Sequence, residues 1–313
     1  MKDRFGRTID YARISLTSRC NLRCPYCYRE EIQPDRTDEL KPDEIAEIVS
    51  VLAELDIQKV RLSGGEPLLR PDLEEIISAV SKTRGIRETV MTTNAQGLAQ
   101  RLRDLKGAGL IRLNISLDSL RAERYRNMNG GSLEEVLSGM DMVIALDMLP
   151  LKINCVLLEG INDDEIEGFI NMARERPLEI RFIELMPIGK LSGQDRRRDP
   201  AEILKSIRKL KPMKAGYPGQ PARCWGGPPF RGSVGFIRAF SDPFCRNCNR
   251  IRITSEGRIR PCLADDTEWD LRGAIGNPAR LKKIIMTAVE SKPEKHRFSE
   301  GFIPSKFMYR IGG

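Results

Sequence analysis

Two groups of cysteine are spaced closely enough to hold a metal-containing group. The first lies in the segment CNLRCPYC, at Cys20, Cys24 and Cys27. Three thiolates on one tight loop can bind three irons of a 4Fe–4S cluster and leave the fourth iron open for chemistry. A structural zinc site with a distant fourth ligand, or three packed cysteines, is the alternative. The spacing, directly after a strand-like segment, favours the cluster.

The second group is a CxxC pair, Cys245 and Cys248, followed by Cys262 after thirteen intervening residues. On spacing alone, two interpretations stay open. One is a zinc ribbon completed by Cys224, and the other is a second three-thiolate cluster with an open iron. In a reducing cytosol, such groups are more often metal ligands or catalytic thiols than disulfides.

The remaining chemistry-bearing residues exclude other classes of site. Cys155 falls on the apolar face of a predicted strand and is expected to pack. The chain has a single histidine, His296, which makes a histidine-rich metal site or a Ser-His-Asp triad implausible. The net charge is +8 over 313 residues, with 31% charged and 40% hydrophobic residues. We expect a cytoplasmic protein without a membrane span or signal peptide, whose basic charge suits an anionic ligand without requiring nucleic acid.

Short apolar runs alternate with helical patterns over about the first 190 residues. This rhythm predicts βα units that build a parallel sheet. Proline and acidic residues near several helix starts support the assignment. The predicted strands are residues 12–17, 59–63, 88–94, 111–118, 151–157 and 179–185. The predicted helices are residues 42–55, 72–82, 98–108, 133–146 and 163–175.

The predicted strands alternate in polarity, which is unusual for buried parallel strands. In the first strand, Ile14 and Leu16 share one face, and Arg13 and Ser15 share the other. The other five strands repeat this pattern. Because burying so many unpaired polar groups is costly, the polar face should surround water or a polar ligand. We therefore predict an open, partial barrel curved around a large anionic substrate. An open sheet with one solvated face is the alternative.

Beyond residue 185 the alternation of strand-like and helical segments ends. This change predicts a barrel domain at 1–190 and a smaller β-rich region at 191–313. We expect an exposed linker at 192–200, a short helix at 201–210 and loops over 212–229, where Pro and Gly are frequent. Strand-like segments follow at 234–240 and 250–254. The last residues, 310–313, are flexible by composition.

The CxxxCxxC spacing after the first strand, with Tyr26 before the last cysteine, resembles the radical S-adenosylmethionine (SAM) superfamily. Gly64-Gly65-Glu66-Pro67, after the second strand, is similar to the GGEP segment of that superfamily. The resemblance implies that the open iron binds the amino and carboxylate groups of SAM and that reductive cleavage generates a 5′-deoxyadenosyl radical. The positions that resemble SAM contacts are Tyr26, Gly65, Ser116 and Met186.

Motifs in the second half resemble the GTP 3′,8-cyclase family of molybdenum cofactor biosynthesis. They are Arg181-Phe182-Ile183-Glu184, Gly235-Phe236-Ile237, the segments 244–252 and 261–263, and the final Gly312-Gly313. The resemblance implies a partial (β/α)6 TIM-like barrel and a radical SAM lyase. Such an enzyme converts GTP to 3′,8-cyclo-7,8-dihydro-GTP. Two 4Fe–4S clusters are implied, the second held by Cys245, Cys248 and Cys262 and facing the first across a basic cavity.

The same resemblance implies a set of substrate-binding residues and partners. The resemblance implies an electron donor of the flavodoxin or ferredoxin type and transfer of the product to cyclic pyranopterin synthase. The protein is expected to be a monomer or homodimer and to bind neither nucleic acid nor membrane. In the family the Gly-Gly tail enters the active site. The positions that match GTP-binding groups are Arg13, Lys59, Arg61, Thr92, Lys152, Arg181, Arg250, Ile251 and Arg252, of which Arg250 and Arg252 are also expected to be catalytic.

Two other classes remain as alternatives. A peptide-modifying radical SAM protein usually carries more C-terminal cysteines and needs no arginines for a triphosphate. A zinc-ribbon nucleic-acid-binding protein would leave the first cysteine set unexplained. One departure from the family pattern is Ala95, which stands where glycine is usual.

Overall fold

The computed structural model describes residues 1–27, 39–188, 191, 203, 207, 210–217, 219–305 and 308–311. Its described strands form one sheet with the order β12-β11-β10-β1-β2-β3-β4-β5-β6-β9-β8-β7. The strands are β1 Tyr11–Ser15, β2 Lys59–Ser63, β3 Glu88–Thr93, β4 Arg112–Ser116, β5 Leu151–Leu157, β6 Leu178–Glu184, β7 Lys211–Pro212, β8 Arg223–Gly226, β9 Ser233–Ile237, β10 Arg250–Ile253, β11 Arg258–Arg260 and β12 Trp269–Asp270.

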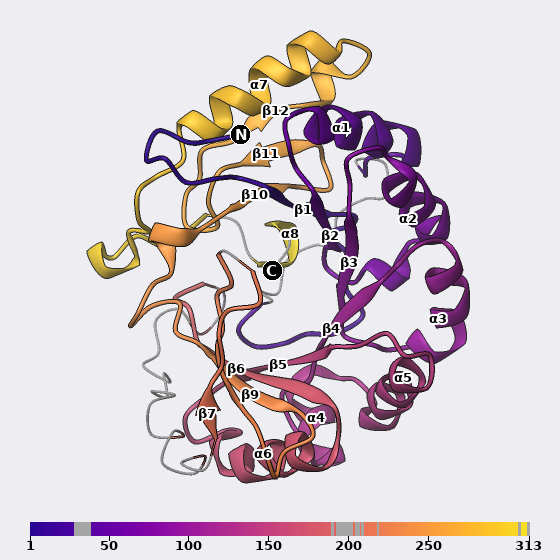
Figure 1. The fold of residues 1–313 in the computed structure, drawn as a ribbon, viewed down its shortest axis with the longest axis vertical. Coiled ribbons are helices and arrows are strands. Elements are labelled where there is room, and N and C mark those ends of the chain that lie inside the picture. Colours follow the sequence, from indigo (N-terminus) through magenta and orange to yellow (C-terminus); the bar gives the residue numbers. More distant parts are fainter. Residues whose placement is uncertain are drawn as a thin grey trace.

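Strands β1 to β6 are parallel neighbours in chain order. They curve into an arc with helices on its outer side, which confirms the α/β partial barrel (Figure 1). All six predicted strands are present, with ends that differ by at most two residues, as is usual for such limits. The helices are α1 Pro42–Glu54, α2 Leu73–Lys82, α3 Leu98–Gly107, α4 Ala122–Asn129, α5 Leu133–Ala145, α6 Ile166–Glu175, α7 Pro278–Glu290 and α8 Met308–Ile311.

The core lies between the outer face of the arc and the helices. Helix α2 buries Leu73, Ile76, Ile77 and Val80, which recur at the spacing of one helix face. The apolar residues of the strands, such as Ile153, belong to the same buried cluster. Because the period of a strand is two, this burial turns the alternate, polar residues toward the inside of the arc.

The C-terminal region extends the sheet at both edges of the barrel. Strand β9 pairs in parallel with β6, and β10 pairs in parallel with β1. Two predictions here were wrong. The stretch 212–229 contains β8, which pairs antiparallel with β9, and residues 310 and 311 belong to α8, where Ile311 is fully buried.

Some features were missed or lie outside the described residues. Neither α4 nor α7 was predicted, although α7 has proline at its first turn and an Asn277 side chain that caps Arg280 N. The expected linker 192–200, most of the expected helix 201–210, and Gly312 and Gly313 lie outside the described residues. In the part of the chain that is described, no helix is long and apolar enough to cross a membrane.

Candidate active site

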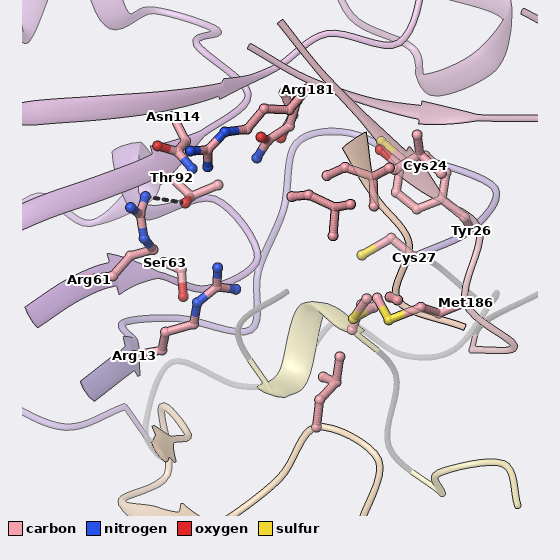
Figure 2. A pocket seen from close by; sticks show the side chains of 18 of the residues that line it. Arg13, Cys24, Tyr26, Cys27, Arg61, Ser63, Thr92, Asn114, Arg181 and Met186 are labelled. Carbon is pink, nitrogen blue, oxygen red and sulfur yellow. Dashed lines mark hydrogen bonds between the residues drawn. The ribbon is translucent and has the colours of Figure 1, made fainter. Parts of the chain in front are cut away.

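A cavity occupies the inside of the arc, where the polar faces of β1 to β6 meet the C-terminal region. Figure 2 shows arginines on one side of it and the sulfur-bearing residues on the other. The short helix α8 lies within the arc (Figure 1), and Met308 lines the cavity. The predicted site residues that line the cavity are Arg13, Cys20, Cys24, Tyr26, Cys27, Arg61, Gly65, Thr92, Ser116, Arg181, Met186, Arg250 and Arg252.

The guanidinium of Arg61 is held on the strand side of the cavity by three neighbouring strands. Its Nη1 donates to Thr92 Oγ1 at 3.0 Å and to Met91 O at 3.3 Å, and its Nε donates to the hydroxyl of Tyr11. Burial would raise the pKa of Tyr11, but the positive charges of Arg61 and Arg13 outweigh it and lower that pKa to about 7. Positive charge therefore dominates this side.

Several buried polar atoms of cavity residues have no partner within the described protein. They are Arg13 Nε, Ser63 Oγ, Asn154 Oδ1 and Arg181 Nη2. Buried polar groups in folded proteins are normally hydrogen-bonded, because an unpaired one costs about 1–3 kcal/mol. A polar ligand in this cavity would supply the missing donors and acceptors.

The electrostatics of this side of the cavity favour an anionic ligand. Burial, together with the nearby Arg181, lowers the pKa of Lys152 to about 8. Burial, together with Arg13 and Arg250, lowers the pKa of Arg252 to about 9. Like charges held together out of water raise the free energy of the charged state. A polyanion bound here would relieve that repulsion, and guanidinium groups suit phosphate oxygens geometrically.

On the opposite side, Cys20, Cys24 and Cys27 all line the cavity. A turn brings the last two together, with Cys27 N donating to Cys24 O at 3.0 Å. Burial raises the pKa of Cys20 to about 11 and that of Cys27 to about 12, so the thiols are protonated until a metal displaces the protons. Three sulfur donors on one loop beside an open cavity fit a 4Fe–4S cluster with one open iron.

Tyr26, between these cysteines, ties the loop to the barrel. Its hydroxyl donates to Asp118 Oδ2 at 2.6 Å, and Asp118 Oδ1 accepts from Val156 N at 2.9 Å. Asp118 follows β4, and Val156 belongs to β5. Through Asp118, the cysteine loop is therefore anchored to the ends of β4 and β5. These contacts fix its position relative to the arginine side of the cavity.

The glycine-rich segment after β2 packs directly against the start of the cysteine loop. Gly65 N donates to Thr17 O at 2.7 Å, and Glu66 N donates to Arg19 O at 2.8 Å. A Cβ on Gly65 would lie 2.0 Å from Arg19 O, so no larger residue fits without a backbone shift. The carboxylate of Glu66 accepts from Thr93 Oγ1 at 2.7 Å and Asn94 N at 2.7 Å, which links this segment to β3.

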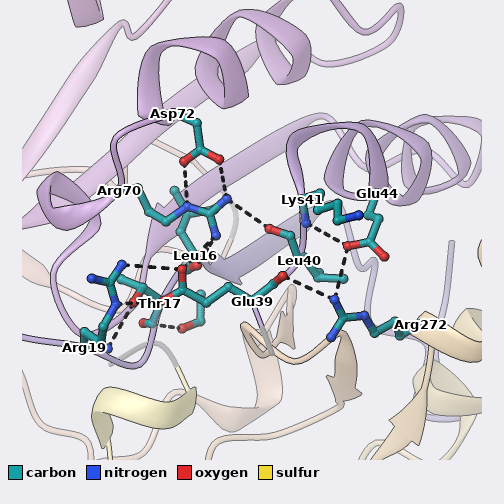
Figure 3. A network of polar contacts seen from close by, with 11 residues as sticks. Leu16, Thr17, Arg19, Glu39, Leu40, Lys41, Glu44, Arg70, Asp72 and Arg272 are labelled. Carbon is teal, nitrogen blue, oxygen red and sulfur yellow. Dashed lines mark hydrogen bonds and ion pairs between the residues drawn. The ribbon is translucent and has the colours of Figure 1, made fainter. Parts of the chain in front are cut away.

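A buried polar network holds the chain before and after the first cysteine set (Figure 3). Arg70 donates to Leu16 O at 3.0 Å and to Leu40 O at 3.0 Å, and it forms a two-point ion pair with Asp72. Glu39 accepts from Arg19 Nε at 3.1 Å and from Arg70 Nη1 at 3.3 Å. Removing one partner would leave the other charged and buried, which is costly.

The second cysteine set lies behind the cavity wall, which corrects the expectation that both sets face one cavity directly. Phe244, Arg250 and Leu263 line the cavity, whereas Cys245, Cys248 and Cys262 do not. Arg250 lies between Cys248 and the cavity. Its guanidinium lies 4.7 Å from the Phe244 ring centroid, and its Nη2 lies 3.8 Å from Cys248 Sγ. The guanidinium thus contacts one thiol of the set, that of Cys248, from the cavity side.

The three thiols of the second set are nevertheless near one another. Burial raises the pKa of Cys245, and the charges of Cys262 and Cys248 raise it further. Burial alone would also raise the pKa of Cys248, but the positive charges of Arg250 and Lys292 lower it to about 6. Among the described residues, no three Cys, His, Asp or Glu side chains converge closely enough to hold a single metal ion. Thiolates on separate irons of a cluster need no such convergence.

Three of the predicted substrate residues are placed differently from the rest. Ile251 is fully buried in the hydrophobic core, on the side of β10 away from the cavity, so its side chain cannot contact a ligand there. Lys59 and Lys152 stand behind Tyr217, which does line the cavity. Their Nζ atoms lie 4.5 Å and 5.8 Å from the centroid of its ring.

Sequence reasoning missed Tyr11, Tyr217 and Asn114 as cavity residues. Tyr11 is two residues before Arg13, so the alternation of β1 could have placed it on the same face. Asn114 lies on the polar face of the predicted strand 111–118, so the same alternation could have placed it in the cavity. Tyr217 lies in a stretch rich in Pro and Gly, and no local signal identifies it. Cys224, left undecided by its spacing, is buried on β8, with its Sγ 3.6 Å from Glu179 Oε1.

Comparisons with known proteins show which families this chain is similar to. The Radical SAM superfamily model matches residues 14–173, and the Molybdenum Cofactor Synthesis C model matches residues 178–298. A GTP 3′,8-cyclase from Alkaliphilus oremlandii (strain OhILAs) is 43% identical over 302 residues, covering 95% of this chain and 94% of the relative. The GTP 3′,8-cyclase from Moorella thermoacetica (strain ATCC 39073 / JCM 9320) is 41% identical over 326 residues and 100% of both chains.

Solved structures show the same fold at lower similarity. Streptococcus suis SuiB bound to precursor peptide SuiA matches with a TM-score of 0.64 at 14% identity. The match covers 92% of this chain and 66% of SuiB, so the chain spans just under two thirds of that structure. At this identity the likeness concerns the fold alone.

Proposed function

Because the chain belongs to the GTP 3′,8-cyclase family of radical SAM enzymes, we propose that its central cavity binds GTP between two sets of cysteine ligands. The family's reaction is the radical cyclisation of GTP in molybdenum cofactor biosynthesis, with a 4Fe–4S cluster and SAM. The observation that carries the residue-level proposal is that the strand-face cations and the first cysteine set line opposite sides of one cavity.

The triphosphate is proposed to lie against the cations of the strand face. Arg13 Nε and Arg181 Nη2 are buried without partners, and Arg61 is already oriented by Tyr11 and Thr92. Lys59 and Lys152 would add charge from behind Tyr217. Fixing the triphosphate there sets the position of the ribose, and catalysis then rests on positioning within a site that excludes water.

On the sulfur side, Cys20, Cys24 and Cys27 are proposed to hold the first cluster, and Tyr26, Gly65, Ser116 and Met186 to contact SAM. All of these residues line the cavity. When bound, the cluster and SAM supply the radical that removes hydrogen from the ribose of GTP. The protein's part is to hold that ribose within reach and to keep water away from the reacting carbon.

Cys245, Cys248 and Cys262 are proposed to hold a second 4Fe–4S cluster, whose open iron takes the guanine end of GTP. Because Arg250 now separates Cys248 from the cavity, this proposal requires the Arg250 side chain to turn toward the substrate when GTP binds. Arg252 Nη1 donates to Ile311 O at 3.3 Å, which places the end of α8 beside the same wall. From the family resemblance alone, we further propose that Gly312 and Gly313 contact the substrate.

The remaining roles are proposed from the family resemblance. Residues 1–190 would generate the radical, and residues 191–313 would bind the guanine end. A flavodoxin or ferredoxin type protein would supply electrons, and cyclic pyranopterin synthase would take the product. The SuiB likeness, being one of fold alone, does not favour a peptide substrate.

The decisive experiment is anaerobic reconstitution with iron and sulfide, followed by incubation with SAM, reductant and GTP. We expect about eight irons per chain from two four-iron clusters and the cyclised product of GTP. About four irons with one zinc would exclude the second cluster. Cleavage of SAM without consumption of GTP would contradict GTP as substrate.

A further inference from the structure

Lys292, at the end of α7, is buried beside the second cysteine set, with 2% of its surface exposed. Its Nζ donates to Arg250 O at 2.8 Å and to Pro261 O at 2.5 Å. Arg250 is two residues after Cys248, and Pro261 directly precedes Cys262. One ammonium group therefore joins the two chain segments that carry these cysteines.

The residues after Lys292 reach the third cysteine through Arg7. The guanidinium of Arg7 donates to Cys245 O at 2.8 Å, to Glu294 O at 2.9 Å and to Pro293 O at 2.7 Å. An ion pair with Asp3 at 2.6 Å holds Arg7 in place. The segment 292–294 thus contacts all three cysteine-bearing segments, two through Lys292 and one through Arg7.

No carboxylate among the described residues pairs with the charge of Lys292. Its recorded hydrogen bonds go to two carbonyl oxygens. An ammonium ion buried without an opposite charge is expensive. Two thiols of the second set, those of Cys248 and Cys245, interact electrostatically with Lys292. A cluster with three thiolate ligands would provide the missing negative charge.

We propose that Lys292 is a positioning residue for the second cluster: it holds the Cys248 and Cys262 segments at cluster spacing, and its ammonium group offsets the negative charge of the thiolates. This inference rests on the proposed second cluster and goes beyond it. It predicts that Lys292 matters to one cysteine set and not to the other. It also predicts that the reduction potential of the second cluster falls without this charge, because net charge near a cluster helps to set its potential.

The test compares Lys292→Met with Lys292→Arg and with the control Lys295→Met, whose side chain is 68% exposed. Each change is made in two full-length backgrounds. One lacks the first set (Cys20→Ala, Cys24→Ala, Cys27→Ala), and the other lacks the second set (Cys245→Ala, Cys248→Ala, Cys262→Ala). Iron content and the midpoint potential of the remaining cluster, followed by electron paramagnetic resonance, are measured in each background.

In the background that retains the second set, we expect Lys292→Met to lose iron or to lower the midpoint potential. Lys292→Arg should keep more iron than Lys292→Met, and Lys295→Met should match its parent. In the background that retains the first set, Lys292→Met should keep its iron and potential. Equal loss in both backgrounds would indicate general misfolding and overturn the inference, as would unchanged iron and potential in both. About four irons in the otherwise unchanged chain would instead refute the second cluster itself.

Discussion

Arg61 on β2 donates a hydrogen bond to Thr92 Oγ1 on β3 at 3.0 Å, across two adjacent parallel strands. The same guanidinium donates to the hydroxyl of Tyr11 on β1. Three consecutive strands of the barrel therefore determine where one charge lies. Because Arg61 is only 5% exposed, little of this orientation depends on solvent.

Replacing Thr92 by valine tests this arrangement. Valine keeps the shape of the side chain and removes the hydroxyl that accepts from Arg61 Nη1. The guanidinium of Arg61 is then held by one hydrogen bond fewer. We expect the KM for GTP to rise roughly tenfold, since a hydrogen bond to a charged group contributes about 1.5–3 kcal/mol and part of it is regained from water. Steady-state kinetics with varied GTP measures the effect.

Thr89→Val is the matched control for that experiment. Thr89 lies on the same strand, is buried where Thr92 is half-buried, and points to the opposite face, where its Oγ1 has no hydrogen-bond partner among the described residues. It should leave the KM for GTP unchanged. Equal effects of the two substitutions would show that Thr92 acts only through the packing of β3.

The KM for GTP should depend on pH through Lys152. Burial and Arg181 lower the pKa of Lys152 to about 8 in the free protein, and a bound triphosphate would raise it again. Binding then takes up a proton above about pH 8, so affinity weakens as pH rises through that value. We expect the KM to increase between about pH 7.5 and 9, measured at constant ionic strength.

Lys152→Arg separates this residue from other titrating groups. Its guanidinium stays charged over the whole range, so the increase in KM should flatten. Lys211→Arg, an exposed change on β7, should keep the pH dependence of the parent. If the KM of Lys152→Arg for GTP depends on pH as the KM of the parent protein does, Lys152 does not contribute to GTP binding.

The barrel and its polar face could be predicted because each strand carries its own signal. The alternation of Arg13 and Arg61 with apolar residues determines which face each occupies, whatever the rest of the chain does. These arginines needed only the period of a strand and the order of βα units. Gly65 was predicted from the resemblance to the GGEP segment instead, and its close contact with Arg19 O, which admits no side chain, is visible only in the structure.

What the sequence could not predict depends on pairing between distant segments. Strand β8 is short and lies among prolines and glycines, and it is a strand only through its pairing with β9 and β7. The arginine at 250 was expected to share the cavity with Cys248, but its contact with the Phe244 ring sets it between the two. Lys292 reaches the site from the end of α7, and no motif identifies it.

Arg252→Ala should impair GTP turnover while both clusters remain assembled. Arg252 lines the cavity, and burial with two neighbouring arginines lowers its pKa to about 9. Its removal takes a cation from the substrate wall and breaks the contact with Ile311 O. We expect turnover to fall by at least tenfold, which corresponds to about 1.4 kcal/mol, with unchanged iron content.

Arg258→Ala removes the same charge from an exposed position on β11 and is the control for Arg252→Ala. Its turnover should equal that of the parent. Loss of iron in Arg252→Ala would show that this arginine supports the second cysteine set rather than the substrate.

Cys224 distinguishes a zinc ribbon from a second cluster. Its Sγ lies 3.6 Å from Glu179 Oε1 and 3.6 Å from Gln220 Nε2, in a buried position on β8. These contacts hold the Cys224 thiol beside Glu179 of β6 and Gln220, and not beside Cys248. Cys224→Ala should therefore retain about eight irons per chain, whereas Cys248→Ala should retain about four. Metal analysis after anaerobic reconstitution measures both variants, and loss of a zinc ion from Cys224→Ala would establish the ribbon instead.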